Sequence, residues 1–200
     1  FEIAALLGCA VTTGVGAVLN RAKVQNGETV VVIGAGGVGL SVVMAAKLKG
    51  ASQVICIDQN ISARNLAIKL GATDFLVSKQ NEDISKKLME RTVVGADHVF
   101  EAVGKRELQS DAIAYCCSGG TVTFVGLDSE DATINLKTTA ITRAEKTISG
   151  SIYGSACTHR DFALYGEKFL EGKLPIDLMV NRRYPVSYTH LRAHETCVQL

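Results

Sequence analysis

Three glycines within six residues are the first feature of this chain whose spacing could do chemistry. Gly34, Gly36 and Gly39 give the pattern G-x-G-x-x-G in "GAGGVG", directly after the β-branched run "TVVVI". In a strand-to-helix turn, the first glycine permits a sharp bend and the second lets the backbone approach a phosphate closely. The third lets the helix pack against the strand. The start of the helix then offers unpaired N–H groups and a positive dipole end to an anion.

An acidic residue follows this turn at the spacing that is typical of dinucleotide-binding sites. Asp58 ends the apolar run "VICID", 19 residues after Gly39. A carboxylate at the end of a second strand accepts hydrogen bonds from the adenosine ribose and repels a 2′-phosphate. The alternative is that Asp58 only caps the loop that follows it. We predict that the turn binds a dinucleotide, and that NAD is preferred over NADP.

The elements needed to position these residues follow from the apolar pattern, which switches repeatedly between strand-like and helix-like periods. Predicted strands are Thr29–Ile33, Gln53–Asp58, Phe75–Val77, Asp97–Val103, Thr121–Val125 and Thr147–Ile152. Predicted helices are Val38–Lys49, Ala63–Leu70, Ile84–Arg91 with Asp83 as cap, Arg106–Cys117 and Asp161–Leu170. This alternation predicts an α/β fold of the Rossmann type, with a doubly wound parallel sheet.

Composition excludes several classes of partner. The chain has 200 residues, of which 47% are hydrophobic and 20% charged, with a net charge of +1. No long basic block is present, which argues against a nucleic-acid or membrane-surface partner. Two uncharged stretches, Ile3–Asn20 and Val30–Ala46, are slightly short for a membrane span and are rich in glycine or threonine. We expect them to be core elements of a cytoplasmic protein.

The six cysteines form no C-x-x-C pair, so neither a zinc ribbon nor a redox motif is indicated. Their apolar neighbours predict reduced, buried thiols. They are Cys9, Cys56, Cys116, Cys117, Cys157 and Cys197. By residue type alone, Cys9 in an apolar helix start is more typical of a small buried side chain than of a metal ligand. Among other polar residues, His98 and Glu101 are interpreted as sheet residues without a catalytic role.

Several segments together resemble the coenzyme-binding domain of the zinc-containing medium-chain alcohol dehydrogenases. They include "GCAVTTGVGAVL", "GAGGVGL", "VICIDQN", "KLGATDF", "GADHVFEAVG", "GGTVTFVGL" and "EKTISGSIYGS". The likeness is greatest to the branch that contains class III (glutathione-dependent formaldehyde) and aryl-alcohol dehydrogenases. It implies that the N-terminal catalytic domain is missing, that residues 1–26 connect to it, and that residues 27–185 form the NAD-binding domain.

The same resemblance implies roles for individual positions. Cys9 matches the third protein ligand of the catalytic zinc, while the other ligands and the proton relay belong to the missing domain. The positions expected to contact NAD are Thr13, Gly34, Gly36, Gly37, Val38, Gly39, Asp58, Val103, Gly104, Val125, Gly126, Leu127, Ile152 and Tyr153. Among these, Thr13 and Val38 match residues that pack against the nicotinamide ring. Ile152 and Tyr153 match the segment beside its carboxamide.

These expectations predict the coenzyme-binding part of a zinc-dependent dehydrogenase that transfers hydride between an alcohol or aldehyde and NAD. The resemblance also implies a homodimer or a higher homo-oligomer, in which the last strand pairs with its twin in a second copy. Two alternatives stay open: a zinc-free quinone or enoyl reductase that uses NADPH, and a non-catalytic NAD-binding module. Residues 186–200, including His190 and His194, resemble a translated sequencing-adapter read-through, so we interpret them as a non-native tail.

Overall fold

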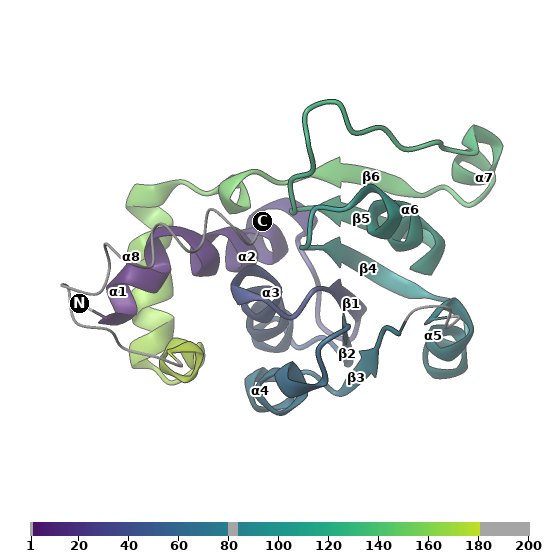
Figure 1. The fold of residues 1–200 in the computed structure, drawn as a ribbon. Coiled ribbons are helices and arrows are strands. Elements are labelled where there is room, and N and C mark those ends of the chain that lie inside the picture. The colour runs from purple at the N-terminus through teal and green to yellow at the C-terminus, as the bar shows by residue number, and fades with distance from the viewer. Residues whose placement is uncertain (1, 80–83, 181–200) are drawn as a thin grey trace, which may run out of the picture.

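A computed structural model describes residues 2–79 and 84–180 of the chain. Its centre is a sheet of six strands in the order β3-β2-β1-β4-β5-β6, in which every neighbouring pair is parallel (Figure 1). The strands are β1 (Thr29–Ile33), β2 (Gln53–Asp58), β3 (Asp74–Val77), β4 (Ala96–Glu101), β5 (Cys116–Phe124) and β6 (Thr147–Gly150). This order is that of a doubly wound Rossmann sheet, and it confirms the predicted fold class.

The central strands form because their residues are β-branched and buried on both faces of the sheet. In β1, Val30, Val31 and Val32 are all fully buried, and β2 is buried from Val54 to Ile57. A continuous apolar run of this kind is typical of a parallel strand with helices on both sides.

Helices cover both faces of the sheet, and each face has its own apolar cluster. In Figure 1, α5 and α6 lie together on one side, while α3 and the N-terminal helices lie on the other. The α-helices after the N-terminal segment are α3 (Gly37–Leu48), α4 (Arg64–Leu70), α5 (Ile84–Thr92), α6 (Arg106–Tyr115), α7 (Thr138–Arg143) and α8 (Thr158–Leu170). Three short 3₁₀ turns complete the described residues: η3 (Ile61–Ala63), η4 (Tyr153–Ser155) and η5 (Ile176–Met179).

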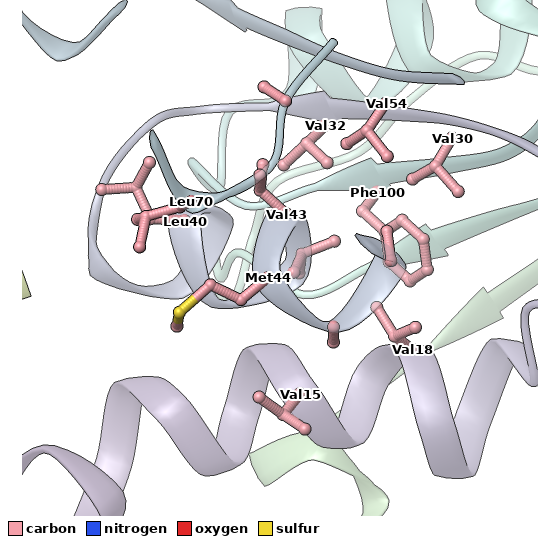
Figure 2. Packing of buried hydrophobic residues seen from close by; sticks show 14 of the residues in the cluster. Val15, Val18, Val30, Val32, Leu40, Val43, Met44, Val54, Leu70 and Phe100 are labelled. Carbon is pink, nitrogen blue, oxygen red and sulfur yellow. The ribbon is translucent and has the colours of Figure 1, made fainter. Parts of the chain in front are cut away.

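The N-terminal segment is helical throughout residues 2–22, with two π-helical stretches. Its parts are α1 (Glu2–Leu6), η1 (Leu7–Val11), α2 (Thr12–Gly16) and η2 (Ala17–Ala22). By length and composition alone, Ile3–Ala22 would be long and apolar enough to cross a membrane. In the structure, however, Val15 and Val18 are fully buried in the same cluster as Met44 of α3 and Phe100 of β4 (Figure 2). A core helix of an α/β domain accounts for this pattern.

The structure corrects several predicted boundaries. Strand β4 ends at Glu101 instead of Val103, and α8 begins at Thr158 instead of Asp161. Helix α6 ends at Tyr115 and β5 begins at Cys116, so the interpretation of Cys116 and Cys117 as helix residues is wrong. The cause is an irregular start of β5, where the register with β4 shifts between Ala96 and His98. Strand β6 ends at Gly150, two residues before the predicted end, because the chain then turns into η4. Predictions for Asp83 and for residues 186–200 fall outside the described residues.

The prediction that the cysteines are buried is only partly right. The five cysteines among the described residues are free, but Cys9 and Cys157 are exposed and Cys117 is half-buried. Burial raises the pKa of the Cys56 and Cys116 thiols to about 12. Those two thiols therefore stay protonated near neutral pH, and they act as small apolar side chains instead of nucleophiles or ligands.

Candidate dinucleotide-binding site

The turn between β1 and α3 is built so tightly that two of its glycines admit no side chain. Gly34 has a φ of +101°, and a Cβ placed there would lie 2.7 Å from Cγ2 of Val103. A Cβ on Gly39 would lie 1.8 Å from the carbonyl oxygen of Gly34. These contacts fix α3 against the end of β1, as expected for the first and third glycines of the motif.

Gly36 differs from its neighbours because nothing in the protein requires it to be glycine. Its φ of −78° and ψ of −175° suit any residue, and a Cβ there would meet no atom within 4 Å. Gly36 and Gly37 are also exposed. An open glycine in a turn that is otherwise crowded is typical of a place where a ligand approaches the backbone.

The N-terminus of α3 is left without a cap, in contrast to its neighbours at the same edge of the sheet. Its N-cap residue makes no side-chain hydrogen bond, and its first turn contains no acidic residue. At the start of α6, by comparison, Asp128 accepts the Arg106 N–H at 2.9 Å. At η3, the side chain of Asn60 accepts the Ser62 N–H at 3.0 Å. The free N–H groups and the dipole of α3 therefore form an anion site aimed at the glycine turn.

Asp58 lies beside this turn, at the end of β2. Its Oδ2 accepts the Ala35 N–H at 2.6 Å, and its Oδ1 accepts the Asn60 N–H at 2.8 Å. The carboxylate thus supports the glycine turn and also caps the next loop, so the two readings of Asp58 do not exclude each other. A carboxylate oxygen has about two acceptor sites, and each Asp58 oxygen has only one of these two protein partners, so both can still accept from a ligand hydroxyl.

A cavity of about 440 Å³ opens between the ends of the central strands and the helices α5 and α6. Gly34, Asp58 and Val103 line it, so the structure brings these three predicted residues together. The cavity has the size of a small-molecule site. Several lining residues on α6 and beyond were not predicted from the sequence: Gln59, Ser78, Lys105, Glu107, Leu108, Asp111 and Tyr115. The spacing of Leu108, Asp111 and Tyr115 by three and four residues was the available signal, since it places them on one face of a helix.

The loop after β4 forms one wall of this cavity, and hydrogen bonds to the buried Glu101 side chain hold it in place. Oε1 of Glu101 accepts the N–H groups of Val103 at 2.8 Å and Gly104 at 2.9 Å. The side chain is fully buried, and burial raises the pKa of this carboxyl despite the hydrogen bonds. The expected structural role of Glu101 at the sheet end is confirmed. His98 is likewise structural: it is buried in β4, with Nε2 2.9 Å from Oε2 of Glu28.

A second group of predicted residues gathers on the other side of the glycine turn. A Cβ on Gly14 would lie 2.4 Å from the Val38 carbonyl oxygen, which shows how closely α2 approaches the start of α3. A Cβ on Gly154 would lie 3.0 Å from the Thr13 carbonyl oxygen, so the turn that contains Tyr153 packs on the same helix. Thr13, Val38 and Tyr153 thus come from three elements that meet beside the turn.

The remaining predicted residues lie at the ends of β5 and β6. Val125, Gly126, Leu127 and Ile152 line a second cavity of about 460 Å³. Gly104 packs directly against this region, because a Cβ there would lie 2.3 Å from the Leu127 carbonyl oxygen. The predicted positions therefore follow the carboxyl ends of the strands, from Asp58 at β2 to Ile152 after β6. Ligands of open α/β sheets bind outside this edge.

Cys9 stands apart from the other predicted residues. It is exposed in the π-helical stretch η1. Within residues 2–79 and 84–180, no three histidine, cysteine or acidic side chains lie close enough together to hold a metal ion. Since a catalytic zinc needs three protein ligands, the described residues do not by themselves form a zinc centre.

The comparisons with known proteins agree with this geometry. The profile of the family "Zinc-binding dehydrogenase" matches residues 37–170. The S-(hydroxymethyl)glutathione dehydrogenase of Saccharomyces cerevisiae is 34% identical over 189 residues, covering 92% of this chain and 49% of its own length. Alcohol dehydrogenase-like 7 of Arabidopsis thaliana is 36% identical over 180 residues, covering 88% of this chain and 46% of its own length.

A solved structure points the same way. The benzyl alcohol dehydrogenase of Acinetobacter calcoaceticus superposes with a TM-score of 0.89 at 30% identity, over 95% of this chain and 52% of that one. The chain spans about half the length of the curated relatives it matches.

Fold and site together define a Rossmann-type protein with a glycine-rich turn at the switch point of its sheet. The chain belongs to the zinc-binding dehydrogenase family, and it corresponds to the coenzyme-binding region of the medium-chain alcohol dehydrogenases.

Proposed function

We propose that the chain is the NAD-binding part of a zinc-dependent alcohol dehydrogenase that transfers hydride between an alcohol or aldehyde and NAD. The observation that carries the proposal is the uncapped start of α3 behind the open Gly36, with Asp58 at its side. These residues fit a pyrophosphate and an adenosine ribose. The nicotinamide of the bound dinucleotide would take up the hydride that an alcohol loses when it is oxidised.

Selectivity for NAD follows from the charges around the first cavity. Asp58, Glu107 and Asp111 contribute carboxylates to its lining, and Lys105 is its one cationic lining residue. A 2′-phosphate would lie near the Asp58 carboxylate, where two like charges repel. The ribose hydroxyl of NAD can instead donate a hydrogen bond to this group.

Different residues along the carboxyl edge of the sheet would bind different parts of the dinucleotide. Gly34, Asp58 and Val103 would hold the adenosine half, and the α3 N-terminus would hold the pyrophosphate. Thr13, Val38 and Tyr153 would flank the nicotinamide, with Val125, Leu127 and Ile152 beside it.

Zinc enters this proposal only through Cys9. The residues described do not complete a metal site, so we derive no catalytic step through zinc. The family membership supports Cys9 as one thiolate ligand, and its exposure leaves the thiol accessible to further ligands. We expect the chain alone to bind NAD without oxidising alcohols. Appearance of NADH absorbance from the purified chain with ethanol or benzyl alcohol and NAD would contradict that expectation.

The two alternatives are less well supported. A reductase that uses NADPH would place its 2′-phosphate against Asp58, and a non-catalytic module would give no reason for the exposed Cys9. Titration of the 200-residue chain with NADH, followed by nicotinamide fluorescence, tests the proposal. Saturable binding supports it, whereas a folded chain that binds no dinucleotide would overturn it.

The proposed assembly is a homodimer in the cytoplasm. Strand β6 is one of the two edge strands of the sheet, with β3 at the other side, and an edge strand can pair with another copy. The five free cysteines among the described residues support the reducing compartment.

A further inference from the structure

Three consecutive residues after β6 adopt a left-handed backbone. Tyr153 has a φ of 50°, Gly154 of 67° and Ser155 of 49°. Tyrosine and serine rarely take this conformation, and two such residues separated by a single glycine make the turn strained. Strain of this kind persists only where surrounding contacts hold it, and it concentrates at functional sites.

Close packing presses this turn onto the N-terminal helix. A Cβ on Gly154 would lie 2.2 Å from the Thr12 carbonyl oxygen, and a Cβ on Gly16 would lie 2.3 Å from the Gly154 carbonyl oxygen. The Tyr153 hydroxyl donates to the Gly8 carbonyl oxygen at 2.6 Å. The turn is therefore tied to the stretch of helix that carries both Cys9 and Thr13.

A polar network anchors the other side of the turn. The Asn20 amide donates to the Gly154 carbonyl oxygen at 3.2 Å and to Oδ2 of Asp161 at 3.0 Å. Asp161 is only 1% exposed, and it also accepts the Cys157 N–H at 2.9 Å and the Arg160 Nε–H at 2.6 Å. Because both oxygens of this buried carboxylate are hydrogen-bonded, Asn20 is fixed between α8 and the turn.

We propose that Asn20 and the Tyr153 hydroxyl are positioning groups that hold the strained turn 153–155 and thereby set the nicotinamide end of the site. This inference rests on the proposed NAD-binding function. Neither group reaches the first cavity, where the adenosine half would lie. Their loss should therefore weaken contacts to the nicotinamide half and leave contacts to the adenosine half unchanged.

The test compares NADH with ADP-ribose, which lacks the nicotinamide, by isothermal titration calorimetry on the full chain. The variants are Asn20→Ala and Tyr153→Phe, with Asn65→Ala, an exposed position on α4, as the control. For both test variants we expect NADH to bind about three- to tenfold more weakly, the range of one lost hydrogen bond. We expect ADP-ribose affinity to stay within about twofold, and the emission of bound NADH to move toward that of free NADH.

Equal weakening of both ligands, or no change in either, would overturn the inference while leaving NAD binding intact. A wild-type chain that binds neither ligand would instead overturn the proposed function, and the inference with it. If Asn20→Ala fails to fold, Tyr153→Phe decides alone, since it removes only a hydroxyl and keeps the ring.

Discussion

At the scale of single residues, glycines of one turn are glycine for different reasons. Gly39 is required by the protein, because any Cβ would collide with the Gly34 backbone. Gly36 has neither a steric nor a conformational requirement, so we attribute its lack of a side chain to the proposed ligand. The same motif therefore combines a folding constraint and a binding constraint, which substitution can separate.

We expect Gly36→Ala to weaken NADH binding about tenfold or more without destabilising the fold, because its Cβ would occupy the space of a phosphate. Replacing glycine in an unstrained conformation stabilises by about 0.4–1 kcal/mol. Gly39→Ala is the matched control for packing, and it should destabilise by about 1–3 kcal/mol or more. Denaturant unfolding and NADH titration of both variants check these outcomes. A loss of stability in Gly36→Ala as large as in Gly39→Ala would contradict the distinction.

At this scale, the sequence predicted those site residues whose type has few structural roles. The glycines and Asp58 could be predicted because few other residue types permit a tight turn or accept hydrogen bonds from a ribose hydroxyl. Lys105, just before α6, and Glu107 and Asp111 on α6 were missed because charged residues on or beside a helix usually face solvent. Only the three-dimensional placement of α6 over the cavity gives them a possible contact with a ligand.

At the scale of elements, the N-termini of α3 and α6 differ in whether a side chain of the protein accepts hydrogen bonds from them. Both α3 and α6 begin at the carboxyl edge of the sheet, where a ligand would be bound. At the start of α6, Asp128 accepts the Arg106 N–H, and Glu101 holds the preceding loop. The start of α3 has no acidic residue in its first turn, so we expect an anion to bind at α3 in preference to α6.

Element boundaries were the part of the fold that the sequence predicted least well. The core strands β1 and β2 matched their predicted ranges because burial on both faces leaves a continuous apolar run. The start of β5 was misread because "YCCSGG" has no clear period, and the register shift that organises it depends on its pairing with β4. The strained turn after β6 was also invisible, since tyrosine and serine rarely adopt a positive φ.

The network that joins α8 to the N-terminal helix should make stability depend on pH. Burial alone would raise the pKa of Asp161, but hydrogen bonds from Arg160, the Cys157 N–H and Asn20 outweigh it and lower this pKa below 3.8. A lowered pKa contributes stability above the unfolded value, and that contribution is lost as the pH falls through the folded value.

Asp161→Asn should therefore cost about 1–3 kcal/mol at pH 7, because buried donors lose a charged acceptor. The difference in unfolding midpoint between wild type and variant should shrink as the pH falls from 5 toward 3. Thermal unfolding across that range, with Glu167→Gln on the exposed face of α8 as control, measures the difference. A difference that stays constant or grows on acidification would contradict the assigned role of the carboxylate.

At the scale of the whole molecule, the β6 edge of the sheet predicts how two copies would meet. The Ser151 N–H donates to the Phe124 carbonyl oxygen at 2.9 Å, so residue 151 faces β5. Because adjacent residues of a strand direct their N–H groups to opposite sides, the Gly150 N–H faces outward. Gly150 has an open Cβ position and no positive φ, so a side chain meets no obstacle there.

We expect light scattering to give twice the 21.2 kDa mass of the chain, and Gly150→Pro to reduce it to a monomer. Proline removes the outward donor of the edge strand while the bond from residue 151 to β5 remains. Gly166→Ala, an open position on α8, serves as the control and should remain dimeric. A wild-type monomer would remove the proposed dimer, and an unchanged dimer in Gly150→Pro would place the contact elsewhere.

The central claim is that Asp58 makes this site an NAD site, and the most direct measurement is titration with NADH and NADPH. We predict a preference for NADH of at least about tenfold, since like charges ~4 Å apart near a protein surface repel by about 4 kcal/mol. Asp58→Gly should lose that preference by gaining affinity for NADPH. Tighter binding of NADPH by the wild-type chain, or a preference unaffected by Asp58→Gly, would contradict the account.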